Sequence, residues 1–278
     1  MGSVKQLSIG TNIAMGHPFG EALAILKSAG YEYVEISSIH NMCEHADPRF
    51  MNEEYAALFR QQLCEHGLGC FAIAGHVDLT EEPQLNYFLK KIEFAARIGA
   101  KFVNTNSGPK SRLAEFRVSI RRVIKQAEKW GITVCLESHG DIVDTAKDGA
   151  RILKEINHPL IRLNYDTGNT YFYQKGKISI EEDIKEGFEF LEHVHLKDIS
   201  ISGNSVRYRP LGKGDLNFPA IFNSLKALGR EIPIGIEIPI FVSGTLDQIG
   251  PLGYPMPADS IREAARDSLA YVRDCLNN

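Results

Sequence analysis

Four consecutive strand-like segments of the chain each end in a residue that can bind a metal ion. These residues are Glu137, Asp166, His195 and Glu237, and successive members are separated by 29, 29 and 42 positions. Taken alone, a carboxylate or imidazole at the end of a strand is typical of a structural ion pair or a buried hydrogen bond. Three carboxylates packed together repel one another unless a cation lies between them, so the set predicts a metal centre. Carboxylate and imidazole ligands suit one divalent ion of the Mn²⁺, Mg²⁺, Co²⁺ or Zn²⁺ type.

A divalent ion held in this way acts as a Lewis acid toward a carbonyl oxygen and an adjacent hydroxyl group of a substrate. That interaction acidifies the neighbouring C–H group and stabilises the enediolate that forms when the proton leaves. Glu137 and Glu237 end different strands and approach from opposite sides, so one can remove a proton and the other can return it. Epimerisation, aldose–ketose isomerisation and dehydration share this enediolate, and the ligand set alone leaves the three reactions open.

Each of the four residues belongs to a short apolar run, and such runs alternate with amphipathic segments along the whole chain. The predicted strands are Leu7–Ile13, Tyr33–Ser37, Cys70–Ala74, Phe102–Asn106, Thr133–Glu137, Ile161–Asp166, His193–Lys197 and Ile234–Ile238. The helix-like segments include Pro18–Ser28, Glu53–His66, Pro83–Ile98, Leu113–Trp130 and Thr145–Ile156. Strands joined by helices pair in parallel, because each helix is a crossover connection. Eight units of about 35 residues predict an α/β protein in which residues 1–278 form a single (β/α)8 TIM barrel domain.

The sequence after the first predicted strand contains no GxGxxG or Walker motif, which argues against an open sheet that binds a nucleotide. In a (β/α)8 barrel the carboxyl ends of all the strands meet at one face, where active sites lie. We therefore expect Glu35, His76 and Asn106 to join the four candidate ligands around one mouth. Two long segments, Asn41–Asn52 and Pro239–Pro257, follow strands on the same face and are candidates for a lid or an interface.

The composition argues against several classes of partner. The chain has 31 basic and 35 acidic residues and a net charge of −4, without the basic excess expected for nucleic-acid binding. Its apolar runs are too short to span a membrane, and Met1–Lys5 contains no apolar signal core. The five cysteines are an odd number without a CxxC pair, which is typical of reduced thiols in a cytoplasmic protein.

Several motifs resemble those of the xylose-isomerase-like TIM barrels, and the resemblance covers essentially the whole chain. They are Leu136-Glu137-Ser138-His139, Asp166-Thr167-Gly168-Asn169, His195-Leu196-Lys197-Asp198, Pro210-Leu211-Gly212-Lys213-Gly214-Asp215 and Ile236-Glu237. This superfamily includes ketose 3-epimerases, sugar and sugar-phosphate isomerases, inosose dehydratases and apurinic endonucleases. The epimerase branch binds its metal through a Glu, an Asp, a His and a second Glu, which match the four candidate ligands above. The choice of His195 rather than His193 as the ligand rests on this resemblance.

The resemblance to the endonuclease branch is incomplete, because that branch uses three metal ions and additional histidines. Asn169 stands where one of those histidines would be needed, and Val206-Arg207-Tyr208 replaces an Asp-x-His pair. The resemblance therefore implies a metal-dependent isomerase or epimerase acting on a ketose-type sugar or derivative, with Glu137 and Glu237 as the acid–base groups. The alternatives are a dehydratase of a keto-polyol such as an inosose and a non-catalytic sugar-binding barrel.

Five further residues are candidates for binding the substrate. Four of them have side chains that can hydrogen-bond sugar hydroxyl groups: His76, Asn106, His139 and Asn169. The fifth, Arg207, follows the seventh predicted strand and either recognises a carboxylate or phosphate group or lies in solvent. The chain has no glycine-rich phosphate-binding loop, which favours a non-phosphorylated sugar. The resemblance also implies a homodimer or homotetramer.

Overall fold

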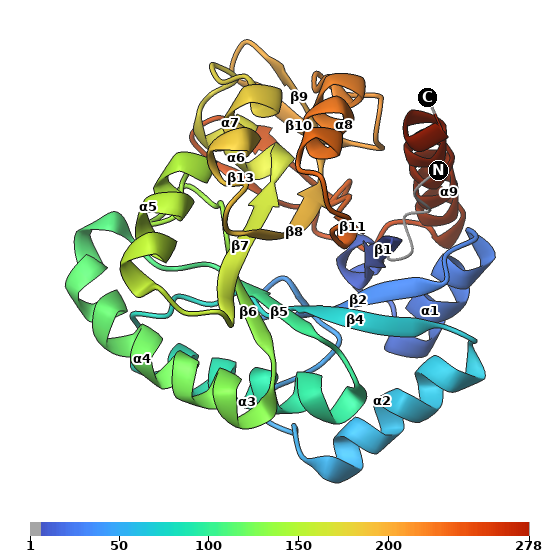
Figure 1. Ribbon diagram of the computed structural model, residues 1–278. Helices are drawn as coiled ribbons and strands as arrows, with labels where there is room; N and C mark the ends of the chain where they lie inside the picture. The colour runs from blue at the N-terminus through green and yellow to red at the C-terminus, as the bar shows by residue number, and fades with distance from the viewer. Residues whose placement is uncertain (1–6, 278) are drawn as a thin grey trace.

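The computed structural model describes residues 7–277, and eight parallel strands form a closed barrel (Figure 1). The barrel closes because β1 pairs with both β2 and β11. Its strands are β1 (Leu7–Gly10), β2 (Tyr33–Ile39), β4 (Gly69–Ala74), β5 (Phe102–Thr105), β6 (Thr133–Glu137), β7 (Ile161–Asp166), β8 (Leu191–Leu196) and β11 (Ile234–Ile236). The prediction of a (β/α)8 barrel is confirmed. Met1–Lys5, which the signal-core prediction concerned, lies outside the described residues.

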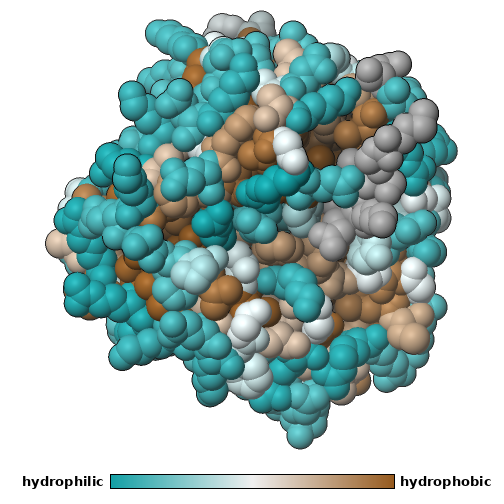
Figure 2. All heavy atoms as spheres, in the orientation of Figure 1, coloured by the Kyte–Doolittle hydropathy of each residue, from teal (hydrophilic) through white to brown (hydrophobic). Residues whose placement is uncertain are grey.

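Helices surround the barrel, and their apolar faces pack against the outer side of the strands (Figure 1). They are α1 (Phe19–Ser28), α2 (Glu53–Glu65), α3 (Glu82–Ile98), α4 (Leu113–Trp130), α5 (Ala146–Ile156), α6 (Thr167–Tyr173), α7 (Ile180–Glu186), α8 (Phe218–Ala227) and α9 (Ala258–Asn277). On the face shown in Figure 2, hydrophilic side chains cover most of the rim and hydrophobic ones are visible between them. Within residues 7–277, no helix combines the length and the apolarity needed to cross a lipid bilayer.

The five helices predicted from periodicity agree with the structure to within one residue at each end. The first predicted strand, Leu7–Ile13, is too long, because β1 ends at Gly10 and Thr11–Ala14 form a short 3-10 helix. Two side chains account for this change of direction. The hydroxyl of Thr11 accepts a hydrogen bond from the backbone N–H of Ser37 at 2.9 Å, and the amide of Asn12 donates to Glu237 at 2.9 Å. These contacts hold the 3-10 turn against β2 and Glu237 instead of extending β1.

A small antiparallel sheet follows the carboxyl ends of β8 and β11, where loops were predicted. It consists of β9 (Asp198–Ser202), β10 (Ser205–Arg209), β12 (Val242–Thr245) and β13 (Ile249–Pro251). Pro239–Pro257 therefore contributes two strands that extend the β9–β10 hairpin. The buried side chains of Ile199, Val206 and Phe241 form an apolar cluster that includes residues of this sheet. The other long segment, Asn41–Asn52, contains β3 (Cys43–Glu44), which pairs with β2.

The turn after β10 is built around the carboxylate of Asp198. That carboxylate accepts hydrogen bonds from the backbone N–H groups of Gly212 and Gly214 at 2.9 and 2.8 Å. A Cβ atom on Gly214 would lie only 2.2 Å from Oδ1 of Asp198, so a side chain there would separate the two segments. The Pro210–Asp215 motif thus ties the small sheet to the end of β8.

Candidate metal centre

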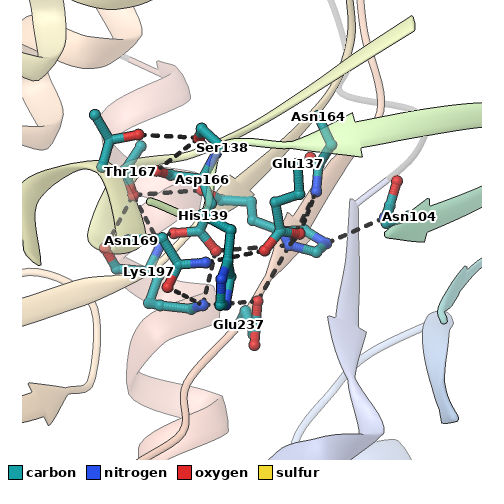
Figure 3. A network of polar contacts seen from close by, with 12 residues as sticks. Asn104, Glu137, Ser138, His139, Asn164, Asp166, Thr167, Asn169, Lys197 and Glu237 are labelled. Atoms are coloured by element: carbon teal, nitrogen blue, oxygen red, sulfur yellow. Dashed lines mark hydrogen bonds and ion pairs between the residues drawn. The ribbon is translucent and has the colours of Figure 1, made fainter. Parts of the chain in front are cut away.

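The carboxyl ends of four neighbouring strands bring the four candidate ligands together. Glu137 ends β6, Asp166 ends β7, His195 is the penultimate residue of β8, and Glu237 directly follows β11. All four are buried, and one ligand atom from each lies within 4.8 Å of the other three. In Figure 3 the three carboxylates gather at one place in the mouth of the barrel. The grouping expected from the sequence is therefore present, and its role as a metal site stays a prediction.

Two of the carboxylate oxygens that meet at this centre are held by charged neighbours rather than by ordinary hydrogen bonds. Nδ1 of His195 lies 2.9 Å from Oε2 of Glu137 and 3.1 Å from Oε2 of Glu237. Oδ2 of Asp166 and Oε2 of Glu237 are buried, and each faces the charged groups of His195 and Lys197 rather than a neutral hydrogen-bond donor among the described residues. Buried carboxylate oxygens without a neutral donor, beside an imidazole nitrogen, form a donor set suited to a divalent cation. These residues therefore fit the metal that the sequence predicts.

A buried lysine that was not among the predicted site residues contacts the same carboxylates (Figure 3). Nζ of Lys197 lies 2.7 Å from Oδ2 of Asp166 and 3.0 Å from Oε2 of Glu237. It also donates a hydrogen bond to Oδ1 of Asn169 at 3.0 Å. Burial lowers the pKa of Lys197, but the carboxylates of Asp166 and Glu237 outweigh burial and raise the pKa well above its ordinary value. Its position two residues after His195, on the same side of the strand, could have identified it.

The charges around the two glutamates keep both of them ionised. Burial raises the pKa of Glu137, but the imidazoles of His76 and His195 outweigh burial and hold it well below its usual range. Burial likewise raises the pKa of Glu237, but Lys197 and His195 hold it far below its usual range. Both side chains are thus carboxylates at neutral pH, able to bind a cation or to accept a proton.

Metal binding to this centre is expected to release a proton from His195. Burial lowers the pKa of this imidazole, but Glu35 and Glu137 outweigh burial and raise the pKa well above its ordinary value of about 6.5. A metal ion needs the lone pair on Nδ1, so the proton held by the metal-free ring must leave. The affinity for Mn²⁺ should therefore increase as the pH rises through that pKa. Titration calorimetry in two buffers of different ionisation enthalpy measures the proton, and a pH-independent affinity without proton release would contradict the assignment.

The second oxygen of each glutamate is held by an asparagine amide. Nδ2 of Asn169 donates to Oε1 of Glu137 at 2.9 Å, and Nδ2 of Asn12 donates to Oε1 of Glu237 at 2.9 Å. Each glutamate thus directs one oxygen toward the cluster and has the other fixed at its own side of the site. Asn169 was predicted at the site, but Asn12 was not, because it fell within the predicted first strand, Leu7–Ile13, rather than beyond the carboxyl end of that strand.

His76, Asn106 and His139, which were predicted to bind substrate, lie beside this centre. Nε2 of His76 is 3.0 Å from Oε2 of Glu137, and its buried Nδ1 has no partner among the described residues. Nδ2 of Asn106 lies 3.3 Å from Nδ1 of His139. Asn106 and His139 border a cavity of about 490 Å³ whose other walls include Asp78, Lys110 and Asp141. The positions of these three residues are compatible with substrate binding, which stays a prediction.

Arg207 is not brought together with the other candidates. It is exposed on β10, and its neighbour Tyr208 is buried with its ring 5.8 Å from Nζ of Lys197. Adjacent residues of a strand point to opposite faces, so Arg207 points away from Lys197 and borders a separate cavity with Glu263 and Asp267.

Replacement of Arg207 by alanine is therefore expected to change kcat/KM by no more than about twofold, as is usual for a surface substitution. The exposed position of the side chain on β10 is the reason. Steady-state kinetics with the identified substrate measures the effect. A loss of kcat/KM of about tenfold or more would support the role in substrate binding predicted from the sequence.

Glu35 lies deeper than predicted, because it is in the middle of β2 rather than at the mouth. Its side chain is almost fully buried on the side of His195 opposite the other ligands, with Oε2 3.0 Å from Nε2 of that ring. Burial raises the pKa of Glu35, but His195 and His193 outweigh burial and lower it below the usual range. Glu35, His193 and His195 also form a second group of closely spaced candidate metal ligands.

Known proteins resemble this chain over nearly its whole length. The family model described as xylose isomerase-like TIM barrel matches residues 23–275. D-allulose 3-epimerase from Methylomonas sp., solved in complex with D-allulose, is 19% identical, with a TM-score of 0.70 and coverage of 97% of this chain and 96% of that chain. D-psicose 3-epimerase from Clostridium cellulolyticum H10, solved with D-tagatose, is 14% identical, with a TM-score of 0.74 and coverage of 98% and 99%. A xylose isomerase domain protein from Planctomyces limnophilus is 17% identical, with a TM-score of 0.72 and coverage of 98% and 97%. No match was found among curated proteins.

Proposed function

We propose that this chain, which belongs to the xylose isomerase-like TIM barrel family, is a divalent-metal-dependent sugar isomerase or epimerase acting on a ketose-type sugar or derivative. The observation that supports this most directly is the pair Glu137 and Glu237. Each contributes an oxygen to the cluster of candidate ligands and has its other oxygen held by an asparagine. The 3-epimerases of similar fold, solved with D-allulose and D-tagatose, support the substrate class.

Glu137, Asp166, His195 and Glu237 would hold the metal ion, for which Mn²⁺, Mg²⁺, Co²⁺ and Zn²⁺ are the candidates. When bound, the ion supplies Lewis acidity that polarises the carbonyl group of the sugar. The ammonium group of Lys197 adds a positive charge beside Asp166 and Glu237, which favours the development of negative charge on a substrate oxygen. The site therefore favours loss of the proton on the carbon next to the carbonyl.

The two glutamates are the proposed acid–base groups. Glu137 and Glu237 belong to strands that are separated around the barrel by β7 and β8, so they face the centre from different sides. One carboxylate removes the proton from the substrate carbon, giving a cis-enediolate. The other receives a proton from its cationic neighbour, His76 beside Glu137 or Lys197 beside Glu237, and delivers it to the opposite face. That sequence inverts the carbon, which is epimerisation. Return of the proton to the neighbouring carbon would instead interconvert an aldose and a ketose.

Dehydration of a keto-polyol such as an inosose is the second candidate function, and His76 favours it. Burial lowers the pKa of His76, but the adjacent Glu137 outweighs burial and raises the pKa above its ordinary value. A protonated imidazole next to the base can donate a proton to a leaving β-hydroxyl group, which departs as water. A non-catalytic sugar-binding barrel is less favoured, because weak metal retention would not need both glutamates. An apurinic endonuclease is also less favoured, because Asn169 occupies a position where that branch needs a histidine.

The reaction can be identified by incubating the metal-loaded protein with ketoses and inososes in D₂O and following the products by NMR. An epimerase places deuterium at the inverted carbon without loss of water, and an isomerase produces the aldose. A dehydratase produces an enone or diketone chromophore, and a sugar-binding protein produces no change. Protein treated with a chelator is the matched control. Absence of exchange and turnover with every sugar tested would contradict the proposed function.

We also propose that the protein forms a homodimer or homotetramer and works in the cytoplasm on a small sugar, without a nucleic-acid or membrane partner. Its five cysteines are all free, which fits a reducing compartment. The exposed side chains of Phe50 and Tyr254 are candidates for contacts between subunits. Light scattering measures the mass of the assembly, and a monomer at micromolar concentration would contradict the oligomer.

A further inference from the structure

The interior of the barrel beneath the metal centre holds a layer of polar side chains. Branched apolar residues usually fill this part of a TIM barrel. Here Glu35, Asn104, Asn164 and His193 are 0–1% exposed. Burial of polar groups is unfavourable unless they are hydrogen-bonded, so their partners indicate what the layer does.

His195 connects this layer to the metal centre, because its two ring nitrogens face different groups. Nδ1 faces the carboxylates of Glu137 and Glu237, as described above. Nε2 lies 3.1 and 3.0 Å from Oε1 and Oε2 of Glu35. A proton on Nε2 is therefore within hydrogen-bonding distance of a carboxylate, and this contact leaves the lone pair on Nδ1 directed at the metal centre.

The position of Glu35 is itself fixed by its neighbours. Nδ2 of Asn104 donates a hydrogen bond to Oε1 of Glu35 at 2.8 Å. Gly235 of β11 leaves the space that the contact occupies, because a Cβ atom there would lie 2.9 Å from Oε2 of Glu35 and 2.9 Å from Cδ2 of His195. A larger residue at position 235 would therefore push the carboxylate and the ring apart.

We infer that Glu35 is a positioning residue of the metal centre, whose carboxylate accepts the Nε2–H of His195 and so fixes the orientation and tautomer of this ligand. A carboxylate in that position also makes the imidazole a better electron donor to a metal. The inference rests on the proposed metal centre and adds a residue that touches neither the metal nor the substrate. A second ion bound by Glu35, His193 and His195 is the competing interpretation, but Nδ1 of His193 is already within 3.0 Å of Oδ1 of Asn164.

The first test is the affinity and stoichiometry of Mn²⁺ binding to Glu35→Gln. Glutamine keeps the shape of the side chain, but it removes the negative charge and replaces one of the two oxygens that face Nε2 of His195 with an NH₂ group, which cannot accept a hydrogen bond. We expect one ion per chain in both proteins, bound about 10- to 100-fold more weakly by the variant. The matched control is Glu192→Gln on the same strand as His195, because Glu192 is only partly buried and lies 3.8 Å from Arg162. Its affinity should equal that of the wild type.

The second test is the NMR signal of the Nε2-bound proton of His195 in the Zn²⁺-loaded protein. This proton should be strongly downfield and slow to exchange in the wild type and in Glu192→Gln, and shifted or lost in Glu35→Gln. If Glu35→Gln does not fold, Glu35→Asp retains the charge while withdrawing the carboxylate from the ring, and the same losses are expected.

If Glu35→Gln bound Mn²⁺ as tightly as the wild type and showed the same signal for the Nε2-bound proton of His195, the positioning role of Glu35 would be overturned. This would hold even if the wild-type protein proved to be the proposed enzyme. Binding of two ions per wild-type chain would also overturn the positioning role, in favour of a second metal site formed by Glu35, His193 and His195. A wild-type chain that binds no divalent ion would instead refute the metal centre, and with it the proposed function.

Discussion

Replacement of Glu237 by glutamine is expected to lower kcat by about 10²- to 10⁴-fold at saturating metal, the usual contribution of a positioned general acid or base. In the wild type, Oε1 accepts a hydrogen bond from Asn12 while Oε2 faces His195 and Lys197. A glutamine has one amide oxygen, so it cannot both accept from Asn12 and offer an oxygen to the ion. Metal affinity should therefore fall as well, and kcat must be compared at metal concentrations that saturate the variant.

Two other variants separate proton transfer from metal binding. His195→Ala removes a predicted ligand without removing a proposed acid–base group, so it should lose bound metal first and recover part of its activity at high metal concentration. Glu231→Gln changes an exposed glutamate just before β11 and should alter neither property. Bound metal and turnover are measured together for all three variants. If Glu237→Gln turned over at the wild-type rate, the two-carboxylate mechanism would be wrong and Glu237 would serve only as a ligand.

The convergence of the four candidate ligands could be predicted because it follows from strand order and direction alone. In a closed parallel barrel, the carboxyl ends of successive strands are neighbours at one face. Glu137, Asp166, His195 and Glu237 stand at corresponding places in four consecutive strands, so they must converge wherever the helices between them lie. Their grouping did not depend on details of packing, and it is present in the structure.

The partners of these residues depend on barrel closure and on register, which no local pattern specifies. Asn12 precedes Glu237 by 225 positions and meets it because β1 pairs with β11. The pairing of β2 with β4 shifts between Val34 and Glu35, and such a shift changes which side chains lie at the same level of the barrel. The sequence predicted Glu35 at the mouth of the barrel, and its deeper position beside Nε2 of His195 required the structure.

The small antiparallel sheet was missed although one of its segments has a strand pattern. Val206-Arg207-Tyr208-Arg209 alternates apolar and charged residues, as expected for a strand with one buried face. Prolines and glycines in Pro239–Pro257 favoured a loop, because those residues are typical of turns. The pairing of Ser205 with Thr245 joins segments that are distant along the chain, and this long-range contact stabilises both strands.

Replacement of Lys197 by methionine is expected to move metal binding and turnover in opposite directions. Methionine is also long and unbranched, but it removes the ammonium group that lies 2.7 Å from Asp166 and 3.0 Å from Glu237. Without that competing charge the two carboxylates attract a divalent ion more strongly, so metal affinity should rise. Turnover should fall by about 10²- to 10³-fold, the usual effect of removing one preorganised group that stabilises developing negative charge.

The metal-free Lys197→Met protein should also be less stable than the wild type. The pKa of Lys197 is higher in the folded protein than its value of about 10.4 in the unfolded chain. The ammonium group therefore contributes its full stabilisation at any pH below about 10.4, and this contribution is lost only as the pH rises through the pKa of the folded state. At neutral pH the substitution leaves two buried carboxylates without this partner, which should lower the free energy of unfolding by about 3–5 kcal/mol. Urea unfolding measures the change, with Lys213→Met at an exposed position after β10 as the control. Saturating Mn²⁺ should restore part of the lost stability, since ligands that bind only the folded state stabilise it.

The prediction for metal binding has its own contradicting outcome. If the metal affinity of Lys197→Met fell together with its turnover, Lys197 would support the ligands rather than compete with the ion.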